Sequence, residues 1–321
     1  MWRNFSVVYF VTGNKPVKVP VRRGRNQASS AETYTEPALV EESSTMLSWL
    51  RTNAFASGTK GWFAVGYGPF RRLTRSSQIL LPTLDTPTRA THFITQFDED
   101  RALSSFEPWM VFLDYRLAKD PNDHEAEKML TIGKKAIVSL LPGNVEIAGI
   151  TRNGLVQFKV NGQIVPTIGL SDGYRSMIAL AGDLIWRLLQ AFPDMDDPTE
   201  ASGVVLIDEL DIHLHPIWQR NIANWLRDAF PNLQFIVATH SPLVAIGAGE
   251  EALTLRFRAQ EEGNMTVEST VDISAYDVDR VLRSPAFCLV STHSPETEEK
   301  IKDYHQLKAR VPHLNAQEKT V

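Results

Sequence analysis

Two short apolar runs in the second half of the chain each end in side chains that can do chemistry. The first, residues 204–207 (Val-Val-Leu-Ile), ends at the carboxylates Asp208 and Glu209. The second, residues 235–238 (Phe-Ile-Val-Ala), ends in the tetrapeptide Thr-His-Ser-Pro at 239–242. Neither run alternates between apolar and polar residues. Both are therefore predicted to be strands covered on both faces, as in a mostly parallel sheet.

The segment between these strands predicts that they are neighbours in one sheet. Apolar residues from Ile217 to Phe230 recur at helical spacing, which gives the order strand, helix, strand. Parallel strands need such a crossover, and ligands of these sheets gather at the carboxyl ends of the strands. We therefore expect Asp208, Glu209 and His240 to share one edge of the sheet.

A third segment of interest lies upstream of both strands. Residues 170–176 (Leu-Ser-Asp-Gly-Tyr-Arg-Ser) directly precede a helical pattern of apolar residues that extends to Leu189. A helix start presents unpaired N–H groups and a positive dipole end to an anion. Ser171, Asp172 and Gly173 are therefore candidate anion-binding residues.

Each of these segments also has a structural explanation. Carboxylates after a strand can cap a helix or lie in a solvated loop, and Ser-Asp-Gly before a helix can be only an N-cap. A histidine after a strand is often a hydrogen-bonded structural residue. What favours a shared site is the occurrence of all three segments in this order, one helix or strand apart.

At this point the chain resembles a known family over residues 66–305. The family comprises the ABC-type ATPases of the SMC, RecF and OLD group, in particular small AAA-family ATPases related to the PtuA component of Septu-type antiphage systems. Residues 170–174 look like its signature loop, 204–209 like its Walker B strand, 210–216 like its D-loop and 239–242 like its switch histidine. Residues 65–73 resemble a strand typical of the subgroup.

The resemblance assigns roles at the sheet edge. Asp208 would hold Mg²⁺ through water, since this hard cation prefers carboxylate and water oxygens. Glu209 would polarise the water that attacks the γ-phosphate of ATP. His240 would contact that phosphate.

The resemblance also implies a second subunit. In the family the signature loop binds ATP held by the partner, so Ser171, Asp172 and Gly173 would bind that nucleotide, with Ser171 and Gly173 capping its γ-phosphate. Asp211 would be a carboxylate at the dimer interface. These roles imply a head-to-tail homodimer that sandwiches ATP, with an HNH-type nuclease or DNA as possible further partners.

One element of such a site is missing from the sequence. A P-loop requires Gly-x-x-x-x-Gly-Lys-Ser/Thr, so that backbone N–H groups wrap the phosphates. The nearest segments, at 13–15, 58–60 and 133–135, lack the required glycine offset and following hydroxyl. We expect that the chain begins after this Walker A segment. The alternatives are a degenerate ATPase and one completed by another polypeptide.

The expected fold is α/β, a P-loop NTPase of ABC/SMC-like type. It has a mostly parallel sheet flanked by helices, an amino-terminal antiparallel β part and a small helical lobe. The expected divisions are a β-rich amino-terminal part of the ATPase (1–100), the helical lobe (101–144), the core with signature, Walker B and switch histidine (145–260), and a carboxy-terminal hairpin and helix (261–321).

Composition fits a cytoplasmic globular protein. The 321 residues are 43% hydrophobic, and the net charge of −5 does not by itself indicate nucleic-acid binding. Neither a secretory signal nor an apolar run of membrane-spanning length is present in the sequence, so no membrane partner is expected. The single Cys288 excludes an internal disulfide and a multi-cysteine zinc site, and its apolar neighbours predict burial.

Two further segments contain histidines that are candidate functional residues. Thr-His-Ser-Pro recurs at 292–295, but there Pro295 and the following acids predict a helix start, so His240 is preferred as the switch residue. His213 and His215 have too few neighbouring ligands to predict a zinc site. We interpret His215 and Pro216 as the start of a helix.

Three functions are consistent with the sequence. The first is an ATP-driven dimer switch in antiphage defence or DNA repair. The second is an OLD-type nuclease, which needs a further carboxylate cluster; Asp272, Asp277 and Asp279 are more simply explained by a loop and a helix cap. The third is a catalytically inactive ATPase remnant that acts as an interaction module, for which the missing P-loop is the main support.

Overall fold

The computed structural model describes residues 5–11, 63–69, 92–93, 96, 103, 106–259, 265–269 and 272–310. For 5–11, 258–259, 265–269 and 310 it describes the backbone alone.

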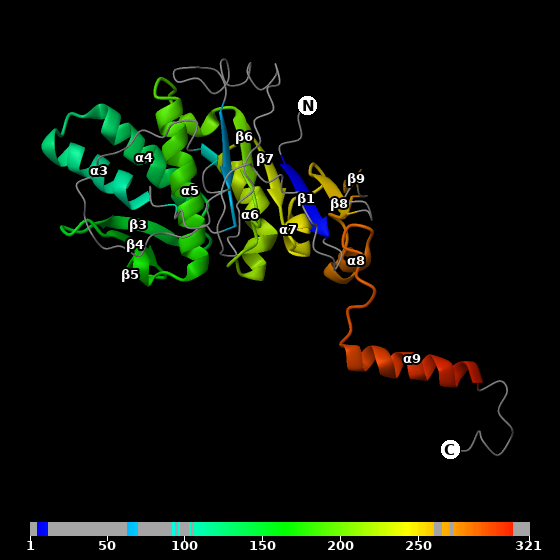
Figure 1. Cartoon of the computed structure of the whole chain (residues 1–321). Helices are drawn as coiled ribbons and strands as arrows, with labels where there is room; N and C mark the ends of the chain where they lie inside the picture. Colours follow the sequence, from blue (N-terminus) through cyan, green and yellow to red (C-terminus); the bar gives the residue numbers. More distant parts are fainter. Residues whose placement is uncertain are drawn as a thin grey trace, which may run out of the picture.

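A six-stranded sheet of order β2-β6-β7-β1-β8-β9 forms the centre of the molecule (Figure 1). Its strands are β1 (Phe5–Val11), β2 (Ala64–Tyr67), β6 (Gly203–Ile207), β7 (Leu233–Ala238), β8 (Leu253–Ala259) and β9 (Met265–Ser269). The pairs from β2 to β8 are parallel, and β9 pairs antiparallel with β8. The predicted α/β fold with a mostly parallel sheet is confirmed.

Strands β6 and β7 are adjacent, as their sequence pattern predicted. They run parallel, with Val205 opposite Phe235 and Ile207 opposite Val237, and all four of these side chains are buried. Helix α6 (Pro216–Ala229) makes the crossover between them. Both strands therefore end at the same edge of the sheet.

The amino-terminal strand β1 lies inside the sheet, between β7 and β8. The antiparallel β part was expected near the amino terminus. Among the described residues, however, β1 and β2 both run parallel to their neighbours. Strand β1 pairs with β7 and β8, and strand β2 pairs with β6.

A separate three-stranded antiparallel sheet has the order β3-β4-β5. Its strands are Val145–Ile150, Val156–Val160 and Gln163–Pro166, followed by the 3₁₀ helix η2 (Thr167–Gly169). The turn that contains Asn153 and Gly154 connects β3 to β4. Gly154 has a φ of 72°, a conformation that glycine adopts without steric cost.

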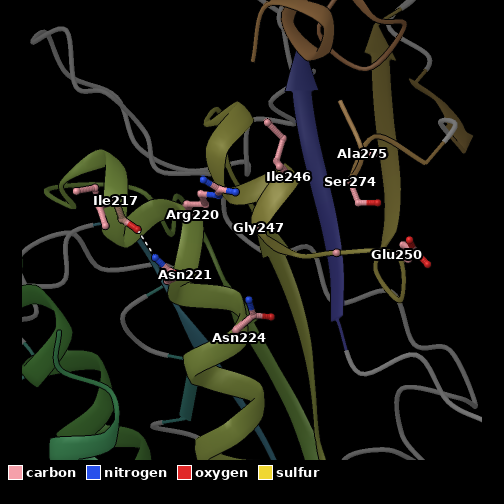
Figure 2. Close-up of a pocket in the computed structure, with 10 residues that line it drawn as sticks. Ile217, Arg220, Asn221, Asn224, Ile246, Gly247, Glu250, Ser274 and Ala275 are labelled. Carbon is pink, nitrogen blue, oxygen red and sulfur yellow. Dashed lines mark hydrogen bonds between the residues drawn. The ribbon is translucent and has the colours of Figure 1, made fainter. Parts of the chain in front are cut away.

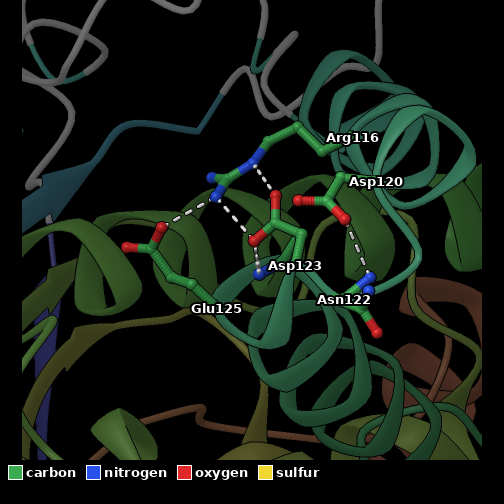
Figure 3. Close-up of polar contacts among 6 residues, drawn as sticks. Arg116, Asp120, Asn122, Asp123 and Glu125 are labelled. Atoms are coloured by element: carbon green, nitrogen blue, oxygen red, sulfur yellow. Dashed lines mark hydrogen bonds and ion pairs between the residues drawn. The ribbon is translucent and has the colours of Figure 1, made fainter.

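Helices α3 (Phe106–Lys119) and α4 (His124–Ser139) form the helical lobe that the sequence predicted. The turn between them is held by Asp123, the N-cap of α4, which accepts a hydrogen bond from the Ala126 N–H. Arg116 reaches over from α3 and donates to both oxygens of Asp123, at 2.7 and 2.9 Å, and to Glu125 at 2.8 Å (Figure 3). This pairing fixes the angle at which α4 leaves α3.

Helix α5 (Asp172–Ala191) stands between the helical lobe with its small sheet and the six-stranded sheet (Figure 1). Every residue from Ser176 to Leu189 is buried, so it is a core helix rather than an amphipathic surface helix. Its anchor to α3 is Trp109, which stacks on Trp186 and donates to the Gly182 carbonyl at 3.1 Å. Its start and its buried polar residues are consequently held in a fixed position.

The remaining helices follow the strands of the second half. They are η3 (Pro198–Glu200), α7 (Pro242–Gly247), α8 (Val278–Arg283) and α9 (Pro295–Arg310). Strands β8 and β9 form an antiparallel hairpin. Helix α9 projects away from the body of the molecule (Figure 1), and in the described part of the chain no helix is long and apolar enough to cross a membrane.

Cys288 is exposed, so the prediction of a buried cysteine was wrong. The N–H groups of Phe287 and Cys288 both donate to the Ser284 carbonyl, which turns the chain away from the core after α8. The neighbouring Val290 is 96% exposed. An apolar run alone did not reveal this turn.

Candidate active site at the carboxyl edge of the sheet

The acid pair lies directly after strand β6. The Asp208 N–H donates to the carbonyl of Tyr67 at 2.8 Å, which extends the pairing of β6 with β2 by one residue. Glu209 has a φ of 46°, in the left-handed region that non-glycine residues rarely adopt. Such backbone strain is concentrated at functional sites, where the surrounding structure enforces it.

Glu209 and His240 meet across the edge of the sheet. Oε1 of Glu209 lies 3.9 Å from Nε2 of His240, and the two side chains are 37% and 60% exposed. The predicted proximity of the two residues is therefore observed. Because both face solvent, they are accessible to a ligand, and the carboxylate can pair with the imidazole when the ring is protonated.

Asp211 is tied to the end of β7. Its carboxylate accepts a hydrogen bond from the hydroxyl of Thr239, the residue just before His240. The main chain reinforces this contact, since the Leu210 N–H donates to the Ala238 carbonyl at 3.2 Å. The segment that follows β6 is thus fixed to the segment that follows β7.

Gln219 on α6 completes this connection, and the sequence interpretation missed it. Its Oε1 accepts from the Ser241 hydroxyl at 2.7 Å, and its Nε2 donates to the Leu214 carbonyl at 2.9 Å. Ser241 in turn caps α7 by accepting from the N–H groups of Leu243 and Val244. A lone glutamine in a helix has no sequence signal that marks such a role.

The start of helix α5 forms one wall of an open pocket of about 600 Å³. Ser171 is the N-cap residue of α5, and its side chain makes no capping hydrogen bond, so its hydroxyl is not used to start the helix. The pocket is lined by Ser171, Asp172, Gly173, Tyr174, His213, His215, Ile217 and Trp218. The predicted signature residues and the segment after Glu209 therefore come together.

Gly173 is where these two walls touch. A Cβ atom at Gly173 would lie 2.9 Å from the carbonyl oxygen of His213 and 2.9 Å from Cζ3 of Trp218. No real Cβ atom approaches backbone so closely, so glycine is required for this contact. The ring of Tyr174 packs edge-on against Trp218, with centroids 4.7 Å apart. No pattern in the sequence marks Trp218 as the side chain that packs against Gly173.

A second pocket, also of about 600 Å³, lies along α6 and the end of α7 (Figure 2). Ile217 is common to both pockets and is 64% exposed. The other lining residues are Arg220, Asn221, Asn224, Ile246, Gly247, Gly249, Glu250, Ser274 and Ala275. None of the predicted site residues lines this pocket.

The competing motifs have structural roles. His215 is the N-cap of α6 with Pro216 at its first position, as predicted. Ser294 begins α9 in the second Thr-His-Ser-Pro, also as predicted. Asp272 accepts from the Ser274 N–H, and Asp277 caps α8 through the Arg280 N–H.

The comparison with known families identifies the class of protein. The family described as "AAA domain, putative AbiEii toxin, Type IV TA system" matches residues 65–246, which is more than half of the chain. The chain belongs to this AAA-domain family. The matched range contains α5, β6, β7 and most of β2, and it includes every predicted site residue.

A retron protein and a Septu protein are among its relatives. The chain is 35% identical over 139 residues to the Retron Vc95 probable ATPase of Vibrio cholerae, a match that covers 42% of this chain and 27% of that protein. It is 29% identical over 243 residues to the Septu protein PtuA of Bacillus mycoides, covering 76% and 31%. The predicted similarity to PtuA-like AAA-family proteins is confirmed. These matches span less than a third of either relative.

Among solved structures, an SMC head domain from Thermotoga maritima gives a TM-score of 0.34 at 18% identity. This match covers 50% of this chain and 52% of that one.

Proposed function

We propose that the chain is an ATP-binding and ATP-hydrolysing ATPase that acts as a nucleotide-driven dimer switch in antiphage defence or DNA repair. The observation that carries this proposal is the approach of Glu209 to His240 within 3.9 Å, directly beside Asp208. A base, an acid partner and a carboxylate for Mg²⁺ are the groups that phosphoryl transfer to water requires.

The residues present fit ATP and Mg²⁺ in part. Asp208 offers the hard oxygen ligand that Mg²⁺ prefers, and Glu209 and His240 are partly exposed beside it. Bound Mg²⁺ would supply charge neutralisation at the phosphates. The segment that would wrap those phosphates, a Gly-rich loop with lysine, has no counterpart in the sequence.

The chain's own residues divide the work of the proposed reaction. Glu209, whose side chain is 37% exposed, accepts a proton from the attacking water. His240 donates a hydrogen bond to the phosphate oxygens. The bond from Thr239 to Asp211 holds both segments in register, because it ties the end of β7 to the segment after β6.

The pocket at the start of α5 is the proposed contact with the second subunit. The unused hydroxyl of Ser171 and the first N–H groups of the helix are donors suited to a phosphate. Asp172 and Gly173 lie beside them, and Asp211 faces the same interface in this proposal. A head-to-tail homodimer would place this pocket over the nucleotide of the partner.

The relatives suggest where such a switch operates. Retron and Septu are the systems named for the similar proteins, so we propose a role in the same kind of antiphage complex. In this proposal ATP closes the dimer and hydrolysis opens it. The movement then licenses an effector, such as an HNH-type nuclease acting on DNA.

Turnover measurements on two variants test the proposal. Glu209→Gln should lower ATP hydrolysis by about 10²–10⁴-fold with ATP affinity retained, because it removes the base and little else. Ser171→Arg should lower turnover by blocking the sandwich. Glu299→Gln, on the exposed face of α9, is the matched control and should leave turnover unchanged. Unchanged turnover in both site variants would contradict the ATPase assignment.

The alternative is an interaction module that no longer hydrolyses ATP. Its support is the missing Gly-rich loop, since charge-assisted phosphate contacts dominate this kind of catalysis. The same assays separate the two: a module would neither bind ATP nor respond to Glu209→Gln, but would still dimerise.

A further inference from the structure

Helix α5 carries a buried ion pair that the proposed function does not use. Asp183 and Arg187 lie one turn apart, with Nε of Arg187 donating to Oδ2 of Asp183 at 2.6 Å. The two residues are only 4% and 8% exposed. Burying two charges is costly unless their hydrogen bonds are completed, so the further partner of this pair deserves an explanation.

That partner comes from the sheet. The hydroxyl of Tyr67, the last residue of β2, donates to Oδ2 of Asp183 at 3.0 Å, and Tyr67 is 1% exposed. Tyr67 thus contacts α5 with its side chain and the end of β6 with its main chain. Its side chain binds α5, while its main-chain carbonyl accepts the N–H of Asp208 at 2.8 Å. Tyr67 therefore links α5 to the backbone of Asp208 through one side-chain and one main-chain hydrogen bond.

The geometry points to Tyr67 as a positioning residue that couples helix α5 to the backbone of Asp208. This inference rests on the proposed function, since it concerns the two halves of that site. A shift of α5 would pull on Asp183, hence on Tyr67, and hence on the carbonyl that holds Asp208. Binding at the Ser171 end of α5 would in this way change the position of the Asp208 backbone.

Amide hydrogen exchange of the full chain tests the coupling without any activity. Tyr67→Phe keeps the ring and its packing but removes the bond to Asp183. We expect exchange in residues 206–209 to become about tenfold faster, which corresponds to the loss of one hydrogen bond to a charged group. The neighbouring strand β7 should exchange as in the wild type.

A matched control makes the same substitution at a tyrosine that lies on helix α3 rather than on α5 or β2. Tyr115→Phe removes the hydroxyl of a side chain that is 49% exposed. It should leave exchange in residues 206–209 unchanged. If both variants change the exchange rates of residues 206–209 alike, the coupling is refuted. It is also refuted if Tyr67→Phe leaves the exchange rates of these residues unchanged. Uniform acceleration throughout the sheet would indicate a purely structural role and would also refute it.

A parallel assay keeps this inference separate from the proposed function. ATP·Mg²⁺ binding by the wild-type chain is measured alongside exchange. Absence of binding would contradict the ATPase proposal, whereas the exchange pattern would still decide whether Tyr67 couples α5 to Asp208.

Discussion

The hydroxyl of Thr239 donates a hydrogen bond to the carboxylate of Asp211, which joins the ends of two neighbouring strands. Thr239 is 2% exposed and also accepts from the Ser241 N–H at 3.0 Å. Glu209 and His240 lie on the two segments that this bond connects. Their separation therefore depends on a residue that contacts neither of them through its side chain.

Removing the Thr239 hydroxyl should loosen both segments. We expect Thr239→Val to lower the free energy of unfolding by about 1.5–3 kcal/mol, because a hydrogen bond to a charged group is lost without a change in side-chain shape. Denaturant unfolding measures the loss. Thr239→Ser keeps the hydroxyl and should restore most of the stability; equal losses in the two variants would assign the effect to packing.

Gly173 should not tolerate a side chain. In Gly173→Ala the new Cβ would collide with the His213 carbonyl and Trp218, so we expect a destabilisation of about 1–3 kcal/mol and loss of any ATP-dependent dimer. Gly169→Ala is the control, since its Cβ would have no neighbour closer than 3.6 Å. Thermal unfolding with sedimentation would reveal the difference, and a wild-type-like Gly173→Ala would exclude the close contact.

Tyr67 should make the fold sensitive to alkali. Burial and the adjacent Asp183 carboxylate raise the pKa of Tyr67 well above its ordinary value of 10.0. Its contribution to stability is therefore fully present below pH 10 and is lost as the pH rises toward the folded-state pKa, because only the unfolded chain ionises readily there.

The measurement is the free energy of unfolding between about pH 8 and about pH 11, a range that includes the ordinary pKa of tyrosine. Tyr67→Phe should flatten the alkaline decline, whereas substitution of the exposed Tyr115 by Phe should leave it unchanged. An equal slope in all three proteins would contradict the assigned environment of Tyr67.

The helical lobe should respond to acid through Asp123. The hydrogen bonds from Arg116, followed by the bond from the Ala126 N–H, lower the pKa of Asp123 from its ordinary value of 3.8. This stability is present above pH 3.8 and is lost as the pH falls through the folded-state pKa. Asp123→Asn keeps a good N-cap, so it should show a flatter acid profile in circular dichroism. A profile as steep as that of the wild type would show that other carboxylates dominate.

Local patterns in the sequence were enough to predict the strands that carry the site. The apolar runs ending at Asp208 and Thr239 are bounded by polar residues, and one helix separates them, so their adjacency followed from simple topology. The same reasoning placed Glu209 near His240. The roles assigned to these residues and to Ser171, Asp172, Gly173 and Asp211 stay predictions, as do the domain boundaries.

Contacts between distant segments could not be predicted in this way. The insertion of β1 between β7 and β8 depends on pairing across more than half of the chain. Tyr67 and Asp183 are 116 residues apart, and no local pattern relates them. The exposure of Cys288 was missed because the turn at Ser284 is set by backbone hydrogen bonds rather than by composition.

The most direct test of the ATPase proposal is the binding of ATP·Mg²⁺ by the Glu209→Gln chain, with sedimentation recorded in parallel. This variant removes the proposed base, so bound nucleotide should persist. The proposal predicts saturable binding that depends on Mg²⁺ and converts monomer to dimer. No binding, with sedimentation identical in the presence and absence of nucleotide, would contradict it.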